Sequence, residues 1–104
     1  MSYVKIPKSY KVGGQKIEVR RVERCDENAM GICSVHTGYI EIAEKLFKDD
    51  VQSEDCKNNT FYHELTHSIL KTMGHDLNND EQFVCCFSSF LTEAMEKAYF
   101  LEEE

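Results

Sequence analysis

Apolar and polar residues alternate along the first part of the chain and follow a helical period along the second. In the first part, the alternating apolar positions are Ile17, Val19, Ile40 and Ile42. A period of two is typical of a half-buried β-strand. Two glycine-containing turns, Gly13–Gly14 and Thr37–Gly38, interrupt these runs, and glycine readily adopts the positive φ of a tight turn. We therefore expect two β-hairpins between about residues 10 and 42.

A helix is predicted from about residue 54 to residue 73. Asp50 or Ser53 precedes it as a candidate N-cap, and Gly74 is placed to end it in a left-handed conformation. Its apolar arc consists of Phe61, Tyr62, Leu65, Ile69 and Met73. We expect this arc to face the sheet.

A second helix is predicted from about residue 80 to residue 101, and Asn79 with Gln82 resembles a capping box at its start. Apolar residues recur along it at the 3.6-residue period of an α-helix. They are Phe83, Phe87, Phe90, Leu91, Ala94, Ala98 and Leu101. We expect this stripe to be part of the core.

Together these elements predict an α+β fold in one domain covering residues 1–104. A small, mostly antiparallel sheet of three to four strands would pack on the two helices. No apolar run approaches the roughly 18 residues of a membrane span, and the N-terminus lacks the apolar core of a signal peptide. The expected location is the cytoplasm, without a membrane partner.

The net charge of −7 at pH 7 argues against nucleic acid as a partner. The charge is unevenly distributed, because residues 1–24 carry +5 and the remaining 80 residues carry −12. The simplest interpretation is that a basic N-terminal hairpin complements an acidic helical part. Five cysteines, an odd number, make a poor disulfide framework and fit a reducing compartment.

The candidate chemistry lies in the pentapeptide His63-Glu64-Leu65-Thr66-His67 of the first predicted helix. Residues four apart lie about 6 Å apart along a helix, so two imidazoles at this spacing can bind one zinc ion. The intervening Glu64 can reach a zinc-activated water and act as its general base. The alternative interpretation is a helix that carries two surface histidines.

A catalytic zinc site needs a third protein ligand and an open position for water. The two histidines lie almost opposite the apolar arc of their helix, so they should face the next helix. Glu81 at its start is the favoured third ligand, and Asp80 and His75 are the alternatives. Asp80 suits the helix N-terminus as a cap instead. The metzincin pattern fails, because Leu70 and Met73 stand where that pattern has glycine and histidine.

Four blocks of the chain carry a family resemblance, namely Lys5–Gly14, Gly38–Ile42, Thr60–His67 and Glu81–Val84. They resemble the short metallopeptidase-type proteins of phages and prophages of Gram-positive bacteria, relatives of the ImmA/IrrE and SprT-like zincin groups. The resemblance implies a minimal zincin fold in which His63, His67 and Glu81 bind zinc and Glu64 is the base. It also implies a protein or peptide substrate in a bacterial host cell.

The sequence therefore predicts a zinc-dependent metallopeptidase that hydrolyses peptide bonds, with Zn2+ as its cofactor. One alternative is a non-catalytic binding module that zinc stabilises, and another is a module that binds no metal. An extended substrate is expected to add a strand beside an exposed sheet edge at residues 39–42. The residue that stabilises the oxyanion stays open among Tyr62, Tyr39, His36, Tyr99 and His75.

Overall fold

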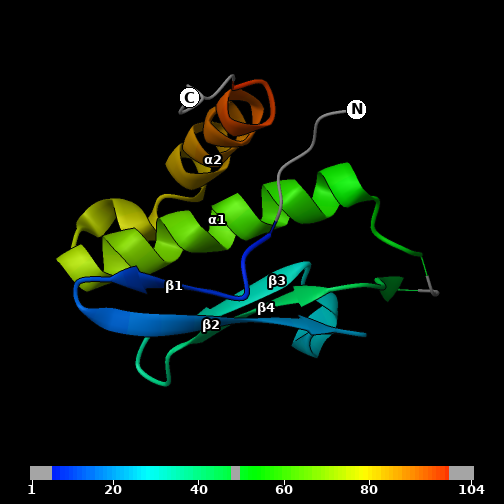
Figure 1. Cartoon of the computed structure of the whole chain (residues 1–104), viewed down its shortest axis with the longest axis horizontal. Helices are drawn as coiled ribbons and strands as arrows, with labels where there is room; N and C mark the ends of the chain where they lie inside the picture. Colours follow the sequence, from blue (N-terminus) through cyan, green and yellow to red (C-terminus); the bar gives the residue numbers. More distant parts are fainter. Residues whose placement is uncertain (1–5, 48–49, 99–104) are drawn as a thin grey trace, which may run out of the picture.

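The computed structural model describes residues 6–47 and 50–98. It has one sheet, one helix that covers a face of that sheet, and a second helix packed on the other side of the first (Figure 1). The strands are β1 (Ser9–Val12), β2 (Gln15–Val22), β3 (Gly31–Ser34) and β4 (Tyr39–Ala43). The helices are α1 (Glu54–Met73) and α2 (Glu81–Glu96), with short 3-10 helices η1 (Asp26–Asn28) and η3 (Asp76–Asn79) in the connections. The predicted α+β class is confirmed. No helix within the described ranges is long and apolar enough to cross a membrane.

Local sequence explains where the first hairpin turns and where α1 begins and ends. Gly13 and Gly14 have φ angles of 56° and 82° in the β1–β2 turn, a conformation that is costly for residues with a Cβ atom. Ser53 caps α1 by accepting a hydrogen bond from the Cys56 N–H, and Gly74 ends the helix with a left-handed φ of 68°. α1 therefore has the predicted bounds and the predicted caps.

The strand order is β1–β2–β4–β3, so β4 lies in the interior of the sheet and β3 lies at an edge. β1 pairs with β2 and β3 pairs with β4 in antiparallel fashion, whereas β2 and β4 are parallel. The expectation that residues 39–42 form an exposed edge is wrong. The physical reason is strand pairing, because β2 and β3 flank β4 on its two sides, and its side chains Ile40 and Ile42 are 0% exposed.

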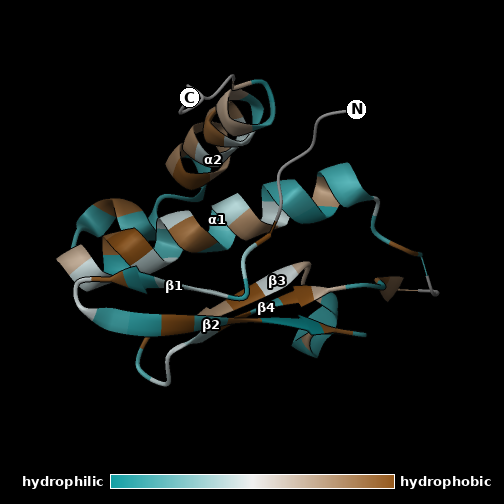
Figure 2. Ribbon diagram, in the orientation of Figure 1, coloured by the Kyte–Doolittle hydropathy of each residue, from teal (hydrophilic) through white to brown (hydrophobic). Residues whose placement is uncertain are grey.

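The core lies between the inner face of the sheet and α1. Its buried cluster consists of Ile17, Ile40, Ile42, Phe61 and Tyr62. Phe61 makes edge-to-face contacts with Tyr10 and Tyr62, with ring centroids 6.0 Å and 5.0 Å apart. Figure 2 shows hydrophobic residues on β2 and β4 beneath α1. Burial of this cluster anchors α1 to the sheet.

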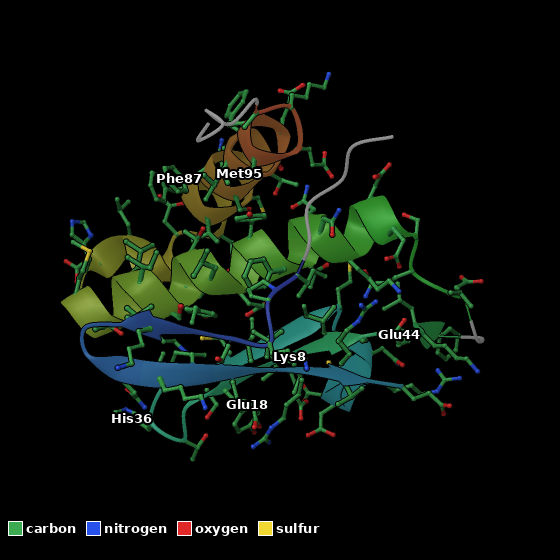
Figure 3. All side chains as sticks on the ribbon, viewed as in Figure 1. Lys8, Glu18, His36, Glu44, Phe87 and Met95 are labelled. Atoms are coloured by element: carbon green, nitrogen blue, oxygen red, sulfur yellow. The ribbon has the colours of Figure 1, made fainter. Side chains whose placement is uncertain are left out.

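Most of the apolar stripe of α2 is not core, contrary to expectation, although Leu91 packs against the core cluster. Phe87 and Phe90 are 46% and 73% exposed, whereas the buried residues of α2 are Val84, Ser88 and Thr92. This face of small residues packs against α1, because helices approach closely where their side chains are small. Figure 3 shows Phe87 on α2, on the opposite side of α1 from the sheet.

The C-terminal parts of both helices also differ from expectation. Ile69 and Met73 of α1 are 39% and 65% exposed, whereas Ser68 and Thr72 of the same turns lie against the β1–β2 hairpin. α2 ends at Glu96 rather than near residue 101, since Lys97 leaves the helical conformation with φ −106° and ψ 9°. Leu101, the last residue of the predicted stripe, lies outside the described residues.

The observed burial predicts that, of two substitutions in α2, the one that removes the smaller side chain lowers the stability more. Val84→Ala removes a side chain that is 0% exposed, so it should lower the free energy of unfolding by about 2 kcal/mol. Phe90→Ala removes a larger side chain that is 73% exposed and should change that free energy by less than about 0.5 kcal/mol. Urea denaturation followed by circular dichroism measures both. A loss of about 3 kcal/mol or more for Phe90→Ala would show that the stripe is core after all.

Candidate metal centre

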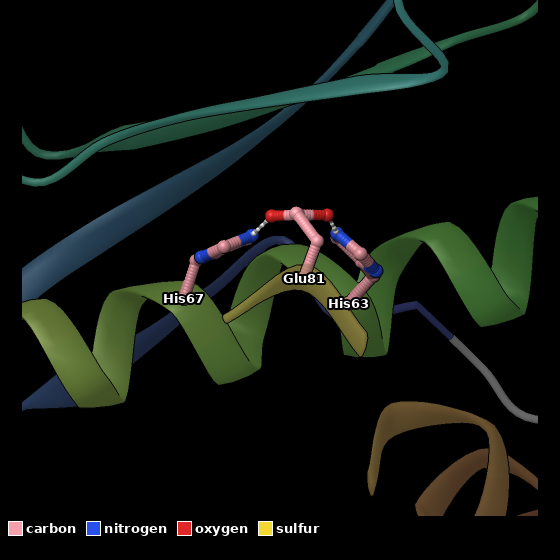
Figure 4. Close-up of side chains that lie close together, drawn as sticks. All are labelled: His63, His67 and Glu81. Carbon is pink, nitrogen blue, oxygen red and sulfur yellow. Dashed lines mark ion pairs between the residues drawn. The ribbon is translucent and has the colours of Figure 1, made fainter. Parts of the chain in front are cut away.

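Three side chains that can bind a metal converge between α1 and the start of α2. They are His63, His67 and Glu81, and one ligand atom from each lies within 4.8 Å of the others. Oε1 of Glu81 lies 2.8 Å from Nε2 of His67, and Oε2 lies 3.3 Å from Nε2 of His63. Figure 4 shows both imidazole rings directed at this carboxylate. The structure thus brings the three predicted ligands together.

The turn between the helices explains why Glu81, rather than its neighbours, reaches the histidines. His75 caps η3 by accepting a hydrogen bond from the Leu77 N–H at 3.1 Å. Asp80 caps α2 by accepting one from the Phe83 N–H at 3.0 Å. Both alternative ligands are therefore engaged in capping, and the predicted capping role of Asp80 is confirmed.

η3 also supplies a hydrogen-bond partner that no sequence spacing had indicated. Nδ1–H of His67 donates to Oδ1 of Asn78 at 2.8 Å. In a neutral ring, as metal binding requires, this bond leaves the lone pair on Nε2, the atom that faces the carboxylate. The adjacent Asn79, expected in the capping box of α2, instead lines a cleft beside the site. On His63, Nδ1 lies 3.9 Å from Sγ of Cys85.

The donor set fits a divalent cation. The ring of His67 lies between Oδ1 of Asn78 and Oε1 of Glu81, each 2.8 Å from one of its two nitrogens. Burial and the neighbouring His67 lower the pKa of His63, an effect that Glu81 opposes, and the lowered pKa favours the neutral, metal-binding form of the His63 ring. Two imidazoles and a carboxylate, with ligand atoms within 4.8 Å of one another, are a donor set typical of zinc.

Glu64 lies beside this cluster and is only 8% exposed. Burial raises the pKa of its carboxyl group to about 7, an effect that His67 opposes and the negative charge of Glu81 reinforces. A carboxyl group with such a pKa can both accept and release a proton near neutral pH. The environment of Glu64 therefore suits a general base.

Two clefts meet at the cluster. One has a volume of about 680 Å³ and extends along the N-terminal half of α1, and the other has about 490 Å³ and extends along its C-terminal half. Gly31, His63, Glu64 and Glu81 line both clefts.

Gly31 lets β3 approach α1 closely, since an added Cβ would lie 2.7 Å from Cγ2 of Thr60 and 3.0 Å from Cγ of Glu64.

The residues proposed from sequence for oxyanion stabilisation lie elsewhere. Tyr62 is buried in the core, and Tyr39 lies on the outer face of the sheet, opposite the helices. His36 is exposed in the β3–β4 connection, on the side of the molecule away from the helices (Figure 3). His75 caps η3. None of these four lines either cleft, and Tyr99 lies outside the described residues.

Comparison of the chain with protein-family models, with curated proteins and with solved structures finds no match. The family resemblance of the sequence therefore stays a prediction. The function has to be argued from the geometry of the site, namely three convergent donors, a buried carboxyl group and two clefts.

Gly31→Ala should destabilise the protein, although glycine-to-alanine changes at compatible positions usually stabilise by about 0.4–1 kcal/mol. The new Cβ would force β3 and α1 apart, so we expect the free energy of unfolding to fall by about 1–3 kcal/mol in urea denaturation. Adding Thr60→Ser, which removes Cγ2 but keeps the hydroxyl, should recover part of this loss. A Gly31→Ala variant at least as stable as the wild type would contradict the close approach.

Proposed function

We propose that the chain is a zinc-dependent metallopeptidase of the minimal zincin type, as its sequence resemblance implies. The observation that carries the proposal is the convergence of His63, His67 and Glu81 beside buried Glu64, where two clefts meet. Structural zinc sites are closed by four protein ligands, whereas catalytic sites keep one position open. Three ligands next to open clefts match the second arrangement.

The side chains around the site have distinct roles in this proposal. When bound, zinc would supply Lewis-acid chemistry, polarising a peptide carbonyl and lowering the pKa of water. His63, His67 and Glu81 would hold the ion, and Asn78 keeps the ring of His67 oriented through its hydrogen bond. Glu64 accepts a proton from the attacking water and passes it to the leaving amine. A pKa of about 7 fits both transfers.

The edge strand β3 offers main-chain groups to an extended substrate. In the described part of the chain β3 pairs with β4 alone, and the carbonyl groups of Met30 and Ser34 accept hydrogen bonds on that side. Successive residues of an antiparallel strand direct their main-chain groups to alternate sides, so Gly31 and Cys33 direct theirs outward. Both residues line the cleft along the C-terminal half of α1. We therefore place the substrate beside β3 as an added strand, instead of beside the interior strand β4.

A non-catalytic binding module stabilised by zinc is the second candidate, and one observation favours it. The cluster joins α1 to α2, whose buried contact residues are otherwise small, namely Val84, Ser88 and Thr92. A metal held between the helices would contribute directly to the stability of the fold. Both candidates require zinc, so peptide hydrolysis is the property that separates them.

One zinc ion should bind per chain, and His63, His67 and Glu81 should all be required. Glu81→Ala should weaken zinc binding by more than about 100-fold in competition titrations with a chelator, because it removes a ligand. Asp80→Ala should keep wild-type zinc affinity, although loss of the cap of α2 lowers stability by about 1 kcal/mol. Unchanged affinity in Glu81→Ala, together with a loss in Asp80→Ala or His75→Ala, would assign the third ligand differently.

Glu64→Gln should retain zinc and slow peptide hydrolysis by about 100- to 10,000-fold, because an amide of the same shape cannot accept the proton. The measurement is cleavage of a peptide library by zinc-loaded protein, followed by mass spectrometry. Glu93→Gln, at an exposed position of α2 outside both clefts, should keep the wild-type rate. Hydrolysis at the wild-type rate in Glu64→Gln would refute the role of Glu64. Zinc binding without hydrolysis by the wild type would favour the binding module.

A further inference from the structure

Each cleft contains one charged side chain that is not part of the metal centre, and the two have opposite signs. Asp55 lines the larger cleft and Lys71 lines the smaller one. Neither side chain forms an ion pair or a hydrogen bond within residues 6–47 and 50–98. Both are exposed, so each is free to meet a charge on a bound ligand.

Asp55 and Lys71 lie on opposite sides of the site along α1. Asp55 is nine residues before Glu64 and Lys71 is seven residues after it, which corresponds to about 13 Å and about 10 Å along the helix. An extended peptide advances about 3.3 Å per residue. Measured along a bound peptide, Asp55 therefore lies about four residues, and Lys71 about three residues, from a peptide bond held beside Glu64.

The direction of a peptide added to β3 follows from the way this strand lies on α1. Gly31 lies against Thr60 and Glu64, whereas Cys33 shares the smaller cleft with Lys71. Burial raises the pKa of Cys33 to about 11, and the nearby charge of Lys71 opposes that rise. β3 therefore runs in the same direction as α1. A peptide antiparallel to β3, the somewhat more stable pairing, begins near Lys71 and ends near Asp55.

We propose that the site selects extended peptides with an acidic side chain before the scissile bond, facing Lys71, and a basic side chain after it, facing Asp55. This inference rests on the proposed peptidase function and names the substrate class of the same site. Met30, Cys56 and Cys85 also line the larger cleft. They offer apolar surface to a residue between the scissile bond and the basic side chain.

The two charges also complement the macrodipole of α1, since Asp55 lies in its first turn and Lys71 in its last. That contribution concerns the stability of the helix and requires no ligand. Measurements of ligand binding therefore separate charge selection from helix stabilisation.

The test measures peptide binding to zinc-loaded Glu64→Gln protein, which should not turn the peptide over. Three fluorescein-labelled peptides share one neutral sequence with blocked ends. The matched peptide has Glu about three residues before the central bond and Lys about four residues after it. The reversed peptide has Lys at the first of these positions and Glu at the second. The neutral peptide has Gln at both positions. An exposed charge pair changes affinity by about threefold, so the matched peptide should bind about tenfold more tightly than the neutral one. The reversed peptide should bind most weakly, and the differences should fade at high salt.

Charge-reversing variants assign each preference to one residue. Lys71→Glu should reverse the preference before the central bond and leave the preference after it unchanged, and Asp55→Lys should do the converse. Lys11→Glu changes the net charge by the same amount as Lys71→Glu, but it lies on β1 at the opposite edge of the sheet. This control should preserve the order of the three Kd values.

Equal Kd values, no peptide binding, tighter binding of the reversed peptide, or equal effects of Lys11→Glu and Lys71→Glu would each overturn the inference. Hydrolysis by the wild-type protein is scored separately. Cleavage of the neutral peptide without charge selection would leave the peptidase function standing. Zinc-loaded wild-type protein that neither binds nor cleaves any of the peptides would count against both proposals.

Discussion

The approach of Glu81 to His63 and His67 is the contact on which the rest of the structure depends. It joins α1, which is anchored to the sheet, to α2, whose large apolar side chains are mostly exposed. Two imidazole nitrogens and a carboxylate at these distances are stable together when a positive charge lies among them. A cation there would therefore link the helices and, next to two open clefts, would also be placed for catalysis.

Much of the site could be predicted from sequence, because its main residues obey local rules. The spacing of His63 and His67 places both on one face of a helix, and capping requirements engage Asp80 and leave Glu81 beside them. Asn78 and Gly31 were missed because their roles depend on contacts distant in sequence. Asn78 meets His67 through the fold of η3, and Gly31 meets α1 because β3 packs against that helix in the folded chain.

The difference between local rules and contacts distant in sequence also explains which features of the fold could be predicted. Alternation and glycine turns correctly indicated the hairpins, and the caps of α1 correctly indicated its bounds. A 3.6-residue stripe shows that a helix has an apolar face, but it does not say what packs there. In α2 the small residues Val84 and Ser88 face α1, and Phe87 and Phe90 face away. Strand order likewise depends on pairing between distant segments, so the interior position of β4 was not apparent from its own residues.

The most direct measurement of the central claim is anomalous diffraction at the zinc absorption edge, from crystals of protein grown with zinc. A metal centre of the proposed kind predicts one peak per chain, about 2.0–2.2 Å from Nε2 of His63, Nε2 of His67 and an oxygen of Glu81. It also predicts that Nδ1 of His67 keeps its hydrogen bond to Asn78. The absence of a peak between α1 and α2, or a peak bound by Asp80 in place of Glu81, would contradict the claim.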